Sequence, residues 1–198
     1  MAVNRSPIMK RCRALGLSPA VLGYNKTSNR NPGGGRNKKV SKYGMQLKEK
    51  QKLKFIYGVL EKQFYHYYEM AEKKEGITGE NLLRILECRL DNIIWRMGMA
   101  NSRREARQLV THGHFTLNGR KANIPSMLVK VGDVIVVKEK FRETVLCKNL
   151  IEALPGKLAP KWLEVDKTNL TAKVIAMPAR DDIDYEVNEQ AIVEFYSK

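Results

Sequence analysis

Two histidines stand two residues apart in the segment HGHFTLNGR, at positions 112 and 114. Such a pair could ligate a metal, exchange protons or contact an acidic ligand. The sequence around them shows no HExxH spacing, no nearby third ligand and no nucleophile-elbow motif. We therefore predict that His112 and His114 belong to a binding surface, that the chain is no enzyme, and that it holds no metal or cofactor.

The cysteines give the second candidate for metal or redox chemistry. Cys12, Cys88 and Cys147 are scattered, and no two of them have CxxC spacing. Their odd number and wide separation are typical of a protein from a reducing compartment. The N-terminus carries no apolar signal segment, and no stretch approaches the ~20 apolar residues of a membrane-spanning helix. We expect a cytoplasmic protein with no membrane partner.

The charge balance indicates a polyanionic partner. Lys and Arg number 36 against 21 Asp and Glu, which gives a formal net charge of +15 over 198 residues. Such an excess attracts nucleic acid from a distance. It is concentrated in residues 1–48, which hold eleven Lys or Arg and no acidic residue. Two interpretations stay open for residues 1–43: a solvated disordered tail, or a basic arm that becomes ordered on RNA, which we favour.

The hydrophobic pattern after residue 43 predicts helices followed by a small antiparallel sheet, an α+β fold. We expect helices near 45–57, 60–75 and 79–98, a helical segment at 143–154, a closing helix at 188–198, and strands at 134–137, 162–166 and 171–177. The expected domains are the basic arm 1–43, a helical domain 44–87 completed by 188–198, and an α+β domain 88–187 with a compact module at about 88–150.

The histidines lie between a short helix and a hairpin of this module. Ser102 and Glu105 have the spacing of a capping box, which predicts a helix that begins at Arg103 and ends near Gly113. Asn-Gly at 118–119, between two strand-like runs, predicts a type I′ turn, because both turn residues need a positive φ.

The short helix begins with two cations, Arg103 and Arg104, although the partial positive charge of a helix N-terminus disfavours them. Arg107 and Gln108 follow one turn later, on the side opposite the apolar stripe. A solvated face would explain this pattern without any function. Arg120 and Lys121 follow the hairpin turn and could extend the basic surface, so we favour phosphate binding.

The segment from Arg89 to Asp133 resembles the RNA-binding module of the family of the fourth small-subunit ribosomal protein. The resemblance rests on RLDN at 89–92, SR at 102–103, ARQLV at 106–110, HG at 112–113, LNG at 117–119, IPS at 124–126 and GD at 132–133. The segments EKQKLKFIYGVLEKQF and NEQAIVEFYSK resemble the bacterial form of that family. Many relatives hold zinc with four N-terminal cysteines, whereas this chain has only Cys12 there and resembles the zinc-free form.

The resemblance implies a structural ribosomal protein that binds 16S ribosomal RNA at a multi-helix junction and nucleates assembly of the 30S subunit body. It also implies contact with the fifth small-subunit ribosomal protein, with other 30S components and with messenger RNA where it enters the subunit, and a contribution to translational accuracy. Two alternatives use the same module: an RNA-modifying enzyme and a stress-related RNA-binding protein.

Charge pattern and resemblance together give the candidate site residues. The predicted RNA-binding residues are Arg5, Lys10, Arg11, Arg13, Lys26, Arg30, Arg36, Lys38, Lys39, Lys48, Lys54, Arg89, Asn92, Arg103, Arg104, Arg107, Gln108, His112, His114, Asn118, Arg120 and Lys121. Glu194 and Tyr196 are the predicted contacts to a protein partner.

Overall fold

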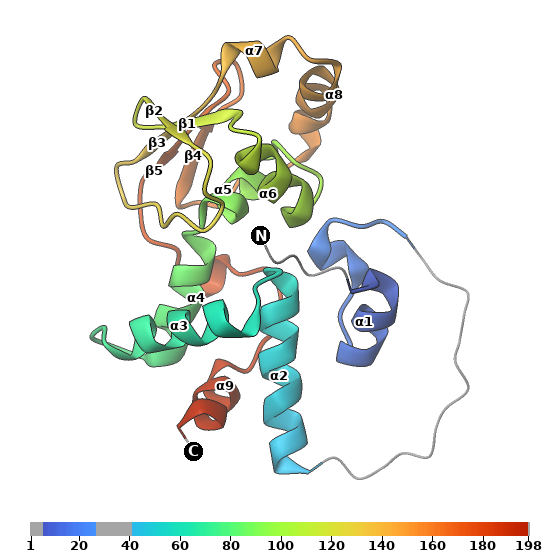
Figure 1. Cartoon of the computed structure of the whole chain (residues 1–198), viewed down its shortest axis with the longest axis vertical. Coiled ribbons are helices and arrows are strands. Elements are labelled where there is room, and N and C mark those ends of the chain that lie inside the picture. Colours follow the sequence, from blue (N-terminus) through green and yellow to red (C-terminus); the bar gives the residue numbers. More distant parts are fainter. Residues whose placement is uncertain (1–5, 27–40, 198) are drawn as a thin grey trace. The chain divides into compact units, whose positions relative to one another are not determined.

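The computed structural model describes residues 6–26 and 41–197, and these form two compact units (Figure 1). The helical unit lies within Met1–Leu82 and Asp184–Lys198, and the α+β unit is Leu83–Ile183. In the parts of the chain that the structure covers, no helix combines the length and the apolar character of a membrane span. The α+β fold class is confirmed.

The helical unit is built around α2 (Lys42–Ile56), which begins at Ser41, whose hydroxyl accepts a hydrogen bond from the Gly44 amide. Its other elements are α1 (Ile8–Leu15), η1 (Pro19–Leu22), α3 (Glu61–Glu72) and α9 (Glu189–Tyr196). The closing helix, predicted at 188–198, begins at Glu189 directly after its N-cap Asn188, and it packs against α2.

The helices α1 and η1 lie within residues 1–43, for which the sequence left open a disordered tail or an arm that becomes ordered on RNA. Cys12, Leu15 and Leu22 are buried there and form a small cluster with Phe55 of α2. The sequence analysis missed this cluster, because its few apolar residues become a core only when α2 supplies the facing side. Residues 27–40, which include the glycine-rich run, lie outside the described residues.

One predicted helix was wrong in its extent. The segment 79–98 forms two helices, α4 (Thr78–Glu87) and α5 (Leu90–Arg96), separated by Cys88 and Arg89. Arg89 has an extended backbone and pairs as an isolated bridge with Leu128. The amide of Val129 donates to the Cys88 carbonyl over 2.9 Å. This pairing with a distant segment interrupts the helix, although the apolar stripe continues through it.

The α+β unit contains a five-stranded antiparallel sheet in the order β2-β1-β3-β5-β4. The strands of the sheet are β1 (Phe115–Leu117), β2 (Arg120–Ala122), β3 (Val134–Val137), β4 (Leu163–Asp166) and β5 (Thr171–Val174). The further helices of the unit are α6 (Arg103–Thr111), α7 (Glu139–Arg142), α8 (Val145–Ala153), η2 (Leu154–Gly156) and η3 (Arg180–Asp182). Figure 1 shows α5 and α6 side by side next to this sheet, and their apolar residues share its core.

The turn between β1 and β2 confirms the predicted hairpin. Asn118 has φ 49° and Gly119 has φ 77°, the left-handed conformation that both central residues of a type I′ turn require. Phe115 pairs with Ala122, and Leu117 pairs with Arg120. This register leaves β2 at the edge of the sheet, with its Arg120 and Lys121 side chains exposed.

Candidate nucleic-acid interface

Helix α6 begins where the sequence predicted. The Ser102 hydroxyl accepts a hydrogen bond from the Glu105 amide over 3.3 Å, and the Glu105 carboxylate accepts one from the Asn101 amide over 2.6 Å. The Lys157 ammonium donates to the carbonyls of Gly98 and Ala100, which fixes the loop before the cap. The start of α6 is therefore held from both sides.

Below α6, an acidic residue joins two of the predicted RNA-binding arginines. The carboxylate of Asp91 accepts hydrogen bonds from Arg89 over 3.0 and 2.6 Å and from Arg107 over 3.0 and 2.8 Å. The side chains of Asp91 and Arg89 are 3% and 4% exposed, and that of Arg107 is 18% exposed. The Arg89–Asp91 pair is bidentate, and both Arg107 donors bond to Oδ2 of Asp91, so this one carboxylate also ties α6 to α5.

A second buried network contains Asn92 and Arg103. The Asn92 amide donates to the carboxylate of Glu87 over 2.7 Å, and its oxygen accepts from Arg103 Nε over 2.8 Å. Arg96 also donates to Glu87, and the Arg103 guanidinium lies 3.8 Å from the centre of the Trp95 ring. These contacts use polar groups that would otherwise be costly to bury.

The burial of Arg89, Asn92 and Arg103 corrects the sequence analysis. All three are less than 6% exposed, and the hydrogen bonds and the ring contact described above join them to side chains or backbone of the same unit. Arg103 was predicted to bind RNA from the side of α6 opposite the apolar stripe, but it is buried there, because α5 supplies both Asn92 and Trp95 on that side. We do not carry these three residues forward as RNA contacts.

The hairpin and the exposed side of α6 bring other predicted residues to the surface. Arg104 is half-buried, and Gln108, His112, Asn118, Arg120 and Lys121 are exposed. Within the part of the chain that the structure describes, the Arg120 and Lys121 side chains have no hydrogen-bond or ion-pair partner. Two adjacent cations at a sheet edge are available to phosphates.

The histidines occupy the corner between α6 and β1. The His114 ring stacks on Phe141 with centroids 4.3 Å apart, and His112 meets it edge-on at 5.8 Å. Lys138 donates to the carbonyl of Gly113 over 2.7 Å. Burial lowers the pKa of His114, and the nearby His112 and Lys138 lower it further. His114 is therefore a neutral, packed ring at pH 7, whereas His112 remains exposed.

The predicted RNA-binding residues of the N-terminal part fall into two groups, those that the structure describes and those that lie outside the described residues. Lys10, Arg11, Arg13 and Lys26 are exposed in and after α1, and Lys48 is exposed on α2. Lys54 is mostly buried and bonds to Glu61 over 2.7 Å. Arg5, Arg30, Arg36, Lys38 and Lys39 lie outside the described residues.

The two predicted protein-contact residues already have partners inside the helical unit. Glu194 accepts a hydrogen bond from the Gln46 amide over 2.7 Å, and the Tyr196 hydroxyl donates to Glu61 over 2.9 Å. The same Glu61 carboxylate accepts from the buried Lys50 over 2.6 Å. Burial raises the pKa of Tyr196, and the bond to Glu61 raises it further, so this hydroxyl stays a donor.

Sequence reasoning missed the residues that support the site, above all Asp91, Glu87 and Phe141. The first two carried a signal, since an acid within or next to an arginine-rich motif is a candidate ion-pair partner. In the ranges 6–26 and 41–197, no group of three or more His, Cys, Asp or Glu could hold a metal ion.

The fold and its surface define a class of RNA-binding module. A model of the S4 domain matches residues 88–135, which contain α5, α6 and the hairpin, and the chain is therefore an S4-domain protein. A model of the ribosomal protein S4/S9 N-terminal domain matches residues 4–87. Together with the relatives below, these matches show that the chain belongs to the small ribosomal subunit protein uS4 family.

Two of the relatives match along the whole chain, and a third matches most of it. The small ribosomal subunit protein uS4 of Agathobacter rectalis is 54% identical over 100% of both chains, and that of Lachnoclostridium phytofermentans is 55% identical over 100% of both. The protein of the same name from Clostridioides difficile is 62% identical over 81% of this chain and 77% of its own. The predicted resemblance is thereby confirmed, and so is the prediction that the chain is no enzyme.

Proposed function

We propose that this protein is a structural component of the bacterial small ribosomal subunit that binds 16S ribosomal RNA directly and helps to nucleate assembly of the subunit body. It works in the cytoplasm, where bacterial ribosomes assemble. Its family membership supports the ribosomal role. The observation that carries the RNA-binding part is the pair of exposed cations, Arg120 and Lys121, next to the capped helix α6.

Phosphate contacts provide most of the binding energy in this proposal. The net charge of +15 draws the RNA toward the protein, and guanidinium and ammonium groups replace counterions on its backbone. Arg104, Gln108 and His112 extend the surface along the exposed side of α6. Arg89 and Arg107 take part indirectly, because their ion pairs with Asp91 hold α6 against α5.

A second surface in the helical unit suits a protein partner. Tyr43 and Tyr65 are 55% and 46% exposed, and their rings lie 5.5 Å from that of Phe195 and 5.4 Å from that of Tyr196. Aromatic side chains are enriched at protein interfaces. We assign this surface, with Glu194 at its margin, to the fifth small-subunit ribosomal protein. We further propose that the interface between the two proteins contributes to translational accuracy, and that messenger RNA passes close to this protein in the assembled subunit.

Filter binding to a fragment of 16S ribosomal RNA tests the RNA-binding part. With about six to ten phosphate contacts, affinity falls by roughly 10³–10⁵ between 50 and 200 mM salt. The purified protein also co-sediments with small subunits reconstituted from their parts and leaves the mass of the RNA unchanged. A nearly salt-independent affinity, or absence of the protein from reconstituted subunits, contradicts the proposal.

A further inference from the structure

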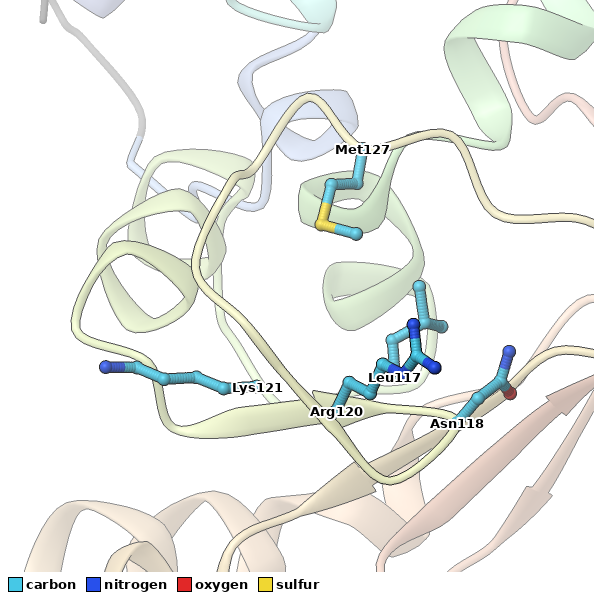
Figure 2. Close-up of a pocket in the computed structure, with 5 residues that line it drawn as sticks. All are labelled: Leu117, Asn118, Arg120, Lys121 and Met127. Carbon is cyan, nitrogen blue, oxygen red and sulfur yellow. The ribbon is translucent and has the colours of Figure 1, made fainter.

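A hollow of about 420 Å³ opens between the β1–β2 hairpin and the loop that follows β2 (Figure 2). Leu117 and Met127 supply its apolar surface, and both are half-buried against the core of the unit. Figure 2 shows the Met127 side chain pointing from the loop toward the hairpin, and Leu117 and Arg120 pointing from the hairpin toward the loop. The hollow is therefore an apolar slot with a guanidinium at its side.

The polar side chains around the hollow differ in whether they have hydrogen-bond partners within the protein. The Asn118 amide donates to Asp133 over 2.8 Å, and its oxygen accepts from the Val134 amide over 2.9 Å, so this side chain is a fixed wall. The Arg120 and Lys121 side chains are exposed, and in the described ranges their charged groups have no hydrogen-bond or ion-pair partner. Two cations at the margin of an apolar slot match a ligand with a flat apolar face and negative charges beside it.

We propose that this slot holds one unpaired base of 16S ribosomal RNA, with the base between Met127 and Leu117 on one side and the Arg120 guanidinium on the other. This inference rests on the RNA-binding function proposed above. A base extruded from a loop or bulge presents its face to such a slot, and the flanking phosphates then reach Lys121 and the edge of the Arg120 guanidinium. A base within a duplex is covered by its neighbours and cannot enter. An acidic peptide would pair with the cations but would leave the apolar surface uncovered.

Crosslinking identifies the occupant. The full-length protein carries a photoreactive benzophenone side chain in place of Met127, and a control protein carries it in place of Leu158, which is 96% exposed and does not line the hollow. With a 16S fragment, the first protein crosslinks to a single unpaired nucleotide that the control does not label. Crosslinks spread along paired nucleotides, or to a protein in reconstituted subunits, overturn the proposal.

Affinities then test whether the base itself is recognised. Removing the base of the crosslinked nucleotide lowers the affinity of the wild-type protein roughly fivefold or more, the effect expected for one stacked base. Met127→Ala lowers affinity for intact RNA and has no further effect on the abasic RNA, whereas Met127→Leu, the matched control, retains affinity. Equal losses by Met127→Ala on both RNAs contradict the proposal.

Arg120→Lys provides a second test that does not depend on the stability of the apolar surface. Lysine keeps the charge but has no planar group to stack on a base. The variant binds intact RNA more weakly with an unchanged salt slope, and it binds abasic RNA as the wild type does. Wild-type affinity of Arg120→Lys for intact RNA overturns the stacking arrangement. These results differ from a failure of the proposed RNA-binding function itself, because in that case the wild-type protein would show no salt-dependent binding to intact RNA.

Discussion

Arg89 and Arg107 face Asp91 beneath the surface of the α+β unit, whereas Arg120 and Lys121 stand on the exposed hairpin of the same unit. All four are cations within the segment matched by the S4-domain model. The first pair shares one buried carboxylate, and the side chains of the second pair have no hydrogen-bond or ion-pair partner among the described residues. Residue type therefore does not assign a role in this module; burial and the nearest acidic group do.

The largest expected effect comes from removing the buried acid. Asp91→Ala leaves Arg89 buried and Arg107 partly buried without their carboxylate, which costs about 3–5 kcal/mol in the free energy of unfolding. Urea denaturation followed by tryptophan fluorescence measures the loss, because Trp95 and Trp162 both lie in this unit.

The matched control for Asp91 is Asp181→Ala, which removes an exposed acid of the same unit and changes stability by less than about 0.5 kcal/mol. If Asp91→Ala is as stable as this control, the ion pairs do not hold α6 in place, and the contrast between buried and exposed cations fails.

A moderate effect is expected in the helical unit, where the acid is only half-buried. The Glu61 side chain is 46% exposed and accepts bonds from Lys50, Lys54 and Tyr196. Burial alone would raise the pKa of Glu61, but these three donors lower it from 4.5 to about 2. Glu61→Gln costs about 1 kcal/mol at pH 7, since solvent screens the exposed side of the pair.

The same lowered pKa fixes the pH dependence of stability. Because the unfolded carboxyl binds its proton at higher pH than the folded one, the contribution of Glu61 is fully present above about pH 4.5. It is lost as the pH falls toward 2. Acid unfolding curves of wild type and Glu61→Gln therefore converge at low pH, and Glu75→Gln, an exposed matched control, keeps wild-type stability at pH 7. Parallel curves down to pH 2 contradict the assignment.

The smallest effect on stability is expected at His114, between α6 and β1. The pKa of His114 is lowered, so the unfolded chain binds its proton more readily than the folded one. Stability from this group is present above about pH 6.5 and declines as the pH falls below that value. His114→Gln removes that part of the slope and costs under about 1 kcal/mol at pH 7.5 through the lost stacking on Phe141. Thermal unfolding from pH 5 to 7.5 measures both, and an unchanged slope would show that the ring does not titrate as described.

Local signals predicted the hairpin and the start of α6 well. An Asn-Gly turn and a Ser102–Glu105 cap are decided by residues within four positions of one another, so the sequence contains the whole cause. The break before α5 and the burial of Arg103 were not predictable in this way. The first depends on pairing with Leu128, and the second depends on Asn92 and Trp95 of another helix.

The sequence predicted which residues belong to the candidate site better than it predicted where their side chains lie. The hairpin cations were named from their position after the turn, and they are exposed as expected. The arginines of α6 were also predicted to bind RNA, because helical periodicity places them opposite the apolar stripe of that helix. That argument treats one face of α6 as solvated, and it fails because α5 covers part of this face.

The most direct test of the account is the salt dependence of 16S RNA binding by the double variant Arg120→Ala, Lys121→Ala. Loss of two phosphate contacts reduces the slope of log affinity against log salt by about two, and urea unfolding stays within about 0.5 kcal/mol of wild type. The control pair Lys161→Ala, Lys173→Ala removes exposed lysines beside and within the β4–β5 side of the sheet and leaves the slope unchanged. An unchanged slope in the hairpin variant, or equal changes in both variants, would contradict the claim that the hairpin cations bind RNA.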